Sequence, residues 1–169
     1  MGRAVFLIGA SGVGKTTVAQ VLERRAPWKG RTHYFDTIGV PSAEAMEADF
    51  GGGEEWQRWA TQQWVNRLAA SDSELQLIEG QTRPSFIREA AERHPDLELR
   101  IVLLDCNTAV REHRLMEFRK RPELATPRMD SWAAYLAGQA HALGLPVIDT
   151  SHLDPQTVAR EVEARTGIA

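Results

Sequence analysis

The chain has 169 residues, of which 43% are hydrophobic and 25% charged, and its formal net charge is −3. The composition is that of an ordinary globular domain, and the acidic balance provides no overall positive field for a nucleic-acid partner. The longest apolar run, Ala4 to Ile8, is too short for a membrane span or a signal-peptide core, and the single Cys106 excludes an internal disulfide. We therefore expect one domain, residues 1–169, in the reducing cytoplasm.

The first predicted strand leads into a phosphate-binding loop. Residues 9–16 read Gly-Ala-Ser-Gly-Val-Gly-Lys-Thr, the pattern G-x-x-x-x-G-K-[ST] in its context of strand, tight loop and helix. Its glycines let successive N–H groups surround an anion at a helix N-terminus. Lys15, expected at the surface, would reach the β- and γ-phosphates of ATP, and the Thr16 hydroxyl would bind Mg²⁺. The predicted nucleotide-binding residues here are Gly9, Ser11, Gly12, Val13, Gly14, Lys15, Thr16 and Thr17.

Helical and extended patterns alternate along the rest of the chain. Apolar residues recur at helical spacing behind the loop, and Pro27 would end that helix. Parallel strands need helical crossovers, so we expect a three-layer α/β fold with helices on both faces of a parallel sheet. Further strands are predicted at 32–35, 75–78, 99–104 and 146–148. Helices are expected to open at Pro41 and Ser42, with Ser42 as the N-cap, behind Gly51–Gly53, at Pro84, at about Thr108, over about 132–143 and at Asp154 and Pro155.

The helix behind Gly51–Gly53 is rich in tryptophan. We expect Trp56, Trp59 and Trp64 on one face of it, together with Leu68. Such side chains are typical of a protein core, but they also suit the wall of a pocket for a planar ligand.

Polar side chains follow each predicted strand. Ligands of parallel α/β sheets bind outside the carboxyl ends of the strands. The residues that follow the strands there are the phosphate loop, Asp36, the segment 79–83, Asp105 and the segment 149–151. The sequence therefore predicts a binding site along this edge.

With these motifs the chain resembles the small P-loop kinases, the nucleoside monophosphate kinase-like group that also contains shikimate, gluconate and adenylylsulfate kinases. The resemblance covers almost the whole chain and is most specific in residues 9–16; residues 34–36, 78–84 and 147–151 also take part. It implies a P-loop NTPase fold with a five-stranded parallel sheet in the order 2-3-1-4-5, and ATP and Mg²⁺ as cofactors. It also implies acceptor-binding helices at about 41–71 and a lid at about 114–128.

Two acidic residues and one arginine are candidates for the acceptor side of the site. Asp36 would orient the acceptor hydroxyl or take its proton, unless it only shapes a turn. Glu79, where nucleotide kinases have Asp, would hold Mg²⁺ through water or contact the acceptor, or be a surface carboxylate. Arg83 would bind the acceptor or form a salt bridge on the following helix. Gln81 and Trp56 complete the predicted acceptor-binding residues.

The predicted lid is basic, and the segment after the last strand is polar. Arg114, Arg119 and Arg121 would close over the phosphates and stabilise developing charge, unless they form a solvated face. Asp149 and Thr150 would border the nucleotide base.

The sequence thus predicts an ATP-dependent kinase that transfers the γ-phosphoryl group of Mg·ATP to a small molecule, preferably a nucleotide or nucleoside. We expect no nucleic-acid or membrane partner, and a monomer or homodimer. The alternative is a nucleotide-binding switch, or a resistance-type protein that sequesters a ligand with little turnover.

Overall fold

A computed structural model describes residues 2–168 and contains one five-stranded parallel sheet in the order β2-β3-β1-β4-β5. This confirms the predicted order. At the carboxyl edge, Ile8 at the end of β1 lies beside Gly80 of β3 and Leu103 of β4. The strands are β1 (Gly2–Ile8), β2 (Thr32–Tyr34), β3 (Leu75–Gly80), β4 (Leu97–Asp105) and β5 (Val147–Asp149).

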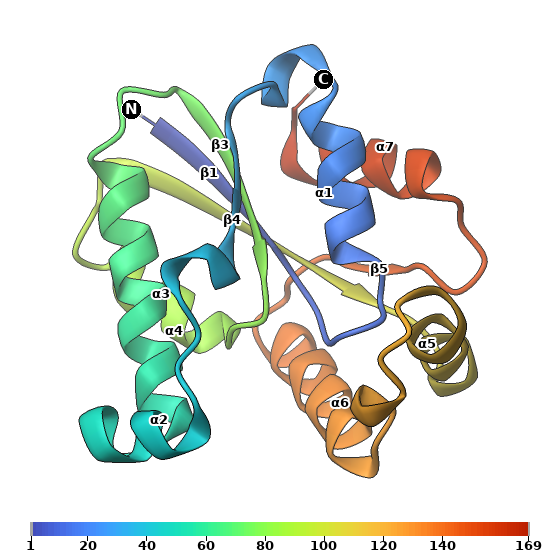
Figure 1. The fold of residues 1–169 in the computed structure, drawn as a ribbon. Helices are drawn as coiled ribbons and strands as arrows, with labels where there is room; N and C mark the ends of the chain where they lie inside the picture. The colour runs from blue at the N-terminus through green and yellow to red at the C-terminus, as the bar shows by residue number, and fades with distance from the viewer. Residues whose placement is uncertain (1, 169) are drawn as a thin grey trace.

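Helices cover both faces of the sheet, which makes the three layers (Figure 1). The central strand β1 supplies both cores because successive side chains of a strand point to opposite faces. Val5 and Leu7 pack in one core, whereas Phe6 and Ile8 pack in the other. The first core is covered by α1 (Lys15–Glu23) and α7 (Pro155–Thr166), and the second by α3 (Gly53–Ala69), α4 (Pro84–Ala91) and α6 (Pro127–Ala142).

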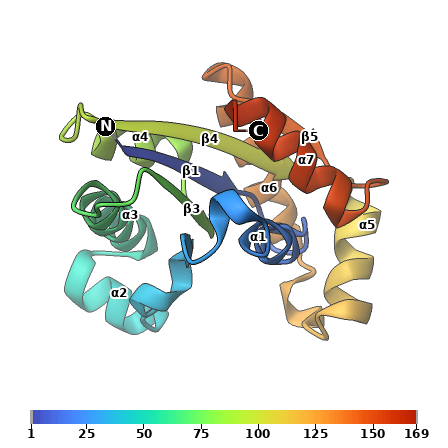
Figure 2. The same ribbon diagram turned by 90° about the horizontal axis from the view of Figure 1, so that it is seen from above.

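Short elements surround the carboxyl edge of the sheet. Figure 2 shows α2 on one flank of the sheet and α5 on the other. Ser42 caps α2, with its Oγ accepting a hydrogen bond from the Ala45 N–H, as its sequence position predicts. These elements are η2 (Phe35–Ile38), α2 (Ala43–Phe50), α5 (Thr108–His113), the π-helical turn η3 (Arg114–Phe118) and η4 (Pro122–Leu124). The remaining short element, η1 (Ala26–Trp28), leads into the amino end of β2 at the opposite edge.

Three local expectations were wrong. The second strand ends at Tyr34, so that Asp36 lies in the 3-10 turn η2. The helix α1 ends at Glu23, because the segment with Pro27 forms the separate turn η1. Trp59 does not share the buried face of Trp56 and Trp64: it is 42% exposed and packs on Phe50 of α2, with 5.2 Å between ring centroids. Within residues 2–168, none of the helices has the length and apolar character needed to cross a membrane.

Candidate active site

The phosphate loop joins β1 to α1 at the centre of the carboxyl edge. Gly12 and Gly14 have φ angles of 87° and 97°, a region open to glycine and strained for other residues. A Cβ atom on Gly12 would also lie 2.9 Å from Cγ of Arg111 and 3.0 Å from Cγ of Leu115. The loop conformation, and its close packing on α5 and η3, therefore require glycine at position 12.

Lys15 is buried beneath this loop, and the expectation that it lies at the surface was wrong. Its side chain folds back under the backbone, and Nζ donates a 3.0 Å hydrogen bond to the Ala10 carbonyl. Burial lowers the pKa of Lys15 from 10.5 to about 8, although the negative charges of Glu79 and Asp36 oppose the change. Within residues 2–168 the ammonium group is thus held in place without a direct ion pair to neutralise it, as a phosphate-binding group would be.

A hydroxyl and a carboxylate meet beside Lys15. Thr16 Oγ1 donates a 3.3 Å hydrogen bond to Glu79 Oε2. Glu79 is buried rather than at the surface; burial raises the pKa of its carboxyl group, and Lys15 opposes that rise. These two hard oxygen donors fit Mg²⁺, which prefers one or two protein ligands with water and phosphate oxygens filling the rest. Within the described residues 2–168 there is no group of three or more acidic, histidine or cysteine side chains that would hold a metal alone.

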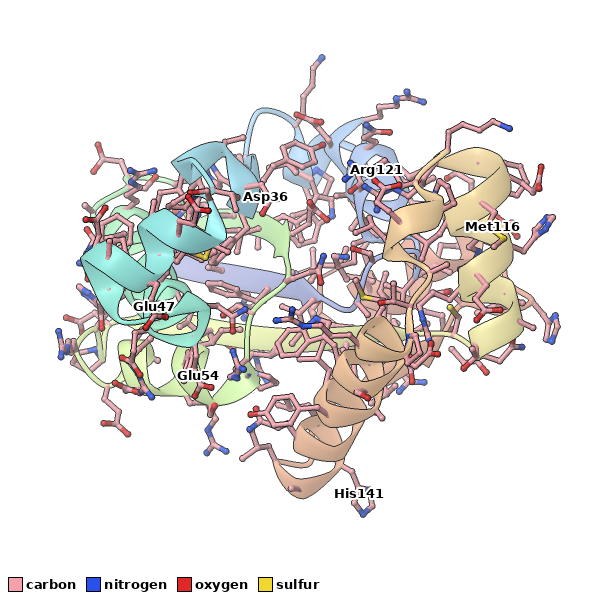
Figure 3. The ribbon with its side chains drawn as sticks, turned by 60° about the horizontal axis from the view of Figure 1, so that its bottom comes forward. Asp36, Glu47, Glu54, Met116, Arg121 and His141 are labelled. Carbon is pink, nitrogen blue, oxygen red and sulfur yellow. The ribbon has the colours of Figure 1, made fainter. Side chains whose placement is uncertain are left out.

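Asp36 is exposed in the first turn of η2, opposite the predicted lid. Its negative charge opposes the lowering of the Lys15 pKa by burial and adds to the rise in the pKa of Glu79. Asp36 therefore lies within electrostatic reach of the phosphate loop. Figure 3 shows Asp36 on one side of the site and Arg121 on the other. An acceptor between the phosphate loop and η2 would therefore meet the exposed carboxylate of Asp36.

Gln81 connects the phosphate loop to α6. Its Nε2 donates a 2.8 Å hydrogen bond to Ser11 Oγ, and its Oε1 accepts a 3.0 Å hydrogen bond from Trp132 Nε1. The Gln81 backbone carbonyl accepts a hydrogen bond from Gln57 of α3. The side-chain amide predicted to bind the acceptor is thus occupied by the protein on both ends.

Arg83 is the cation at the start of α4, and its partners come from α3 and α6. Nη1 donates a 2.7 Å hydrogen bond to Gln57 Oε1, and Nη2 lies 3.3 Å from Glu54 Oε2. The guanidinium carbon lies 5.1 Å from the ring centroid of Trp132 and 5.4 Å from that of Tyr135. The salt bridge is real, but its partner is on α3 and not on the following helix.

The three predicted lid arginines differ in their surroundings. Arg114 donates to the Thr150 carbonyl at 2.6 Å, to Thr150 Oγ1 at 2.9 Å and to the Val13 carbonyl at 3.3 Å. Arg121 pairs with Glu123, and Arg119 is exposed but close enough to lower the pKa of Lys15. Arg114 therefore joins the phosphate loop to the segment after β5, while the other two side chains lie farther out.

Thr150 and Asp149 shape the segment after β5. Thr150 Oγ1 donates a 2.7 Å hydrogen bond to the Val13 carbonyl, which brings this segment against the phosphate loop. Asp149 Oδ1 accepts a hydrogen bond from the Ser151 N–H. Hydrogen bonding by Ser151, through its side chain and its backbone, lowers the pKa of Asp149. Thr150 thus lies against the phosphate loop, and Asp149 stabilises the turn at 149–151, beside which the sequence predicts the nucleotide base.

Trp56 lies in the core beneath the predicted acceptor side. It is 7% exposed, and its ring meets Phe35 edge-on with 6.4 Å between centroids. Its Nε1 is the one buried side-chain nitrogen or oxygen without a hydrogen-bond partner within residues 2–168. In this conformation its ring supports η2 instead of forming an open wall.

Sequence reasoning missed the buried Arg111. Its guanidinium donates to the Cys106 carbonyl and pairs with Asp130 near the start of α6. Arg111 thereby ties the two helices that flank the predicted lid, directly behind Gly12. Its position three residues before Arg114 was the available signal.

No protein-family model matches the sequence, and no curated protein matches it. Solved structures do match over nearly the full length. The tunicamycin resistance protein of Deinococcus radiodurans is similar with a TM-score of 0.68 and 17% identity, over 100% of this chain and 98% of that chain. A shikimate kinase from Acinetobacter baumannii, in complex with shikimate, has a TM-score of 0.64 and 19% identity, over 99% of this chain and 94% of that chain. A gluconokinase from Sinorhizobium meliloti 1021 has a TM-score of 0.61 and 17% identity, over 97% of this chain and 91% of that chain. The chain thus has the fold of the small P-loop kinases.

Proposed function

We propose that the protein is an ATP-dependent kinase that transfers the γ-phosphoryl group of Mg·ATP to a hydroxyl group of a small molecule. The observation that carries this proposal is the grouping of Lys15, Thr16, Glu79 and Asp36 at the carboxyl edge of the sheet. Phosphoryl transfer needs a phosphate cradle, a metal, a group that orients the nucleophile and positive charge around the phosphates. Each of these four requirements has a candidate residue at this edge.

Residues of the phosphate loop would hold and neutralise the nucleotide. The loop N–H groups and the N-terminus of α1 would bind the phosphate oxygens. Lys15 would leave the Ala10 carbonyl and place its charge between the β- and γ-phosphates. Thr16 and, through water, Glu79 would hold Mg²⁺, which when bound neutralises charge on the β- and γ-oxygens.

Asp36 and the lid would act on the transferred group. Asp36 would orient the acceptor hydroxyl and take its proton as the oxygen attacks phosphorus and the bond to the bridging oxygen of ADP breaks. Arg119 and Arg121 would close over the phosphates and exclude water. Arg114, already bound to Thr150 and Val13, would fix the position from which the lid closes.

The proposed acceptor is a nucleotide or nucleoside, bound between η2, α3 and the start of α6. The turn at 79–83 and the stacked pair of Trp132 and Tyr135, whose centroids are 5.7 Å apart, support a planar ligand. The proposed setting is the cytoplasm, with the protein as a monomer or homodimer.

A second candidate is a protein that binds nucleotide and sequesters its ligand with little turnover. One observation favours it: a neighbour in fold is a tunicamycin resistance protein. The two candidates differ in how ADP release depends on the acceptor.

The test combines binding and turnover. Acceptor candidates are first screened by thermal shift with a non-hydrolysable ATP analogue and Mg²⁺, since ligands of the folded state raise the melting temperature. Hits are then assayed for ADP release, with Lys15→Ala as the inactive control. A kinase releases ADP in proportion to the acceptor, whereas slow release independent of every acceptor supports the sequestering protein.

A further inference from the structure

The acceptor side of the site is built from an acidic stretch of the chain. Residues 32–57 contain six carboxylates and no lysine or arginine. The stretch forms β2, η2, α2 and the first turn of α3. Figure 3 shows three of these carboxylates, Asp36, Glu47 and Glu54, on the side of the site opposite Arg121. An acceptor held on this side would lie in a negative field.

The one cation at the start of α4 is already neutralised. Arg83 lies 3.3 Å from the Glu54 carboxylate and donates to Gln57, and its guanidinium stacks near Trp132. Its side chain is only 19% exposed. A carboxylate or phosphate on the acceptor would have to displace Glu54 to reach this arginine.

The nearby cations have other partners as well. Arg58 faces away on α3, where it pairs with Glu55 and Glu89 and lies 4.2 Å from the ring centroid of Phe86. Lys15 and the arginines of the lid serve the triphosphate in the proposed function. Within the described part of the chain, the acceptor side thus offers no spare positive charge.

We infer that the acceptor carries no carboxylate or phosphate, and is an uncharged or positively charged hydroxyl compound. This inference rests on the proposed function and deepens it: of the two acceptor classes above, it selects the nucleoside over the nucleotide. An anionic acceptor would place like charges side by side, which costs affinity, whereas a hydroxyl or ammonium group would donate hydrogen bonds to Asp36 and Glu54. Shikimate itself, a carboxylate, would be a poor acceptor.

The first experiment compares acceptors in matched pairs that differ only by an anionic group. Uridine is paired with orotidine (its 6-carboxylate), gluconamide with gluconate, and methyl shikimate with shikimate. In every pair that supports acceptor-dependent ADP release, the uncharged member is expected to have a kcat/KM at least about tenfold higher, the equivalent of one charge-assisted hydrogen bond. Equal or higher kcat/KM for the anionic member overturns this inference and leaves the kinase in place. If neither the panel nor any acceptor found by the thermal-shift screen stimulates ADP release, the kinase proposal fails and this inference fails with it.

The second experiment releases Arg83. Glu54→Gln removes its carboxylate partner, so the kcat/KM ratio of the uncharged to the anionic member should fall about tenfold. Glu55→Gln is the matched control: it makes the same charge change one residue away, but its partner is Arg58. Its ratio should stay within twofold of the wild type. Equal ratios in the two variants would show that Glu54 does not set the charge preference.

Discussion

Lys15 should take up a proton when a nucleotide binds at alkaline pH. Burial holds its pKa at about 8 instead of 10.5, a cost to the charged side chain of about 3 kcal/mol. Phosphate oxygens beside the ammonium group would return the pKa toward 10.5. At pH 9 the average occupancy of the titratable proton on the Lys15 amine would rise from about 0.1 in the free protein to about 1.0 in the complex, an uptake of about 0.9 proton per site. At pH 7 the uptake would be only about 0.1 proton, because the free lysine is already protonated.

Isothermal titration calorimetry measures this uptake. A non-hydrolysable ATP analogue is titrated with Mg²⁺ at pH 7 and pH 9, in two buffers of different ionisation enthalpy, and the difference in heat gives the protons bound. Lys15→Arg keeps the positive charge but does not titrate in this range, so it should bind without the uptake. Wild-type protein that takes up no proton at pH 9, or an equal uptake in Lys15→Arg, would refute the reasoning.

The same burial has a consequence for the free protein. The folded-state pKa of Lys15 lies below its unfolded value, so the unfolded chain binds more protons between pH 8 and pH 10.5. The contribution of Lys15 to the free energy of unfolding should therefore rise across this window. The free energies of unfolding of wild type and Lys15→Met, measured by urea titration, should converge toward its upper end.

Three substitutions and one exchange experiment test the acceptor side, the fold and the predicted lid. Asp36→Asn should lower turnover by about 10²–10⁴ with little change in the Kd for nucleotide, the effect of losing an acceptor-orienting base; an equal loss of nucleotide binding would mean that Asp36 serves the metal or the fold. Gly80→Ala should lower the free energy of unfolding by about 2–3 kcal/mol in urea, because its Cβ would lie 2.3 Å from Cβ of Phe35. Gly138→Ala, in open space within α6, should instead raise it by about 0.5–1 kcal/mol; a similar loss in both variants would contradict the packing argument. Amide exchange in residues 118–128 should slow most when the ATP analogue and acceptor bind together, and exchange unaffected by both would rule out a lid there.

Local signals in the sequence were enough for most of the fold. The pattern of residues 9–16 requires a strand before it and a helix after it, and the apolar runs at 75–78 and 99–104 are too short for helices. Caps such as Ser42 act within one turn, so their hydrogen bonds follow from neighbouring residues alone. The order of the strands came from the resemblance to the P-loop kinases, which the sheet confirms.

The contacts that join distant segments were beyond local reasoning. The burial of Lys15 depends on how the whole loop turns back over the side chain, which residue types do not reveal. Gln81 reaches Ser11 and Trp132 across 70 and 51 residues, respectively. Trp59 is a large apolar residue but packs on Phe50 of α2, because at 3.6 residues per turn it lies about 140° around the helix from Trp64, on the side of Trp56 away from the buried face.

The fate of the γ-phosphoryl group tests the central claim most directly. ATP labelled with ³²P at the γ-position is incubated with Mg²⁺, the protein and an acceptor selected by thermal shift, and the labelled products are separated. The label is expected in the acceptor in amounts equal to the ADP formed, and Lys15→Ala should abolish both. Label that accumulates as inorganic phosphate, at a rate independent of the acceptor, would contradict phosphoryl transfer to a small molecule.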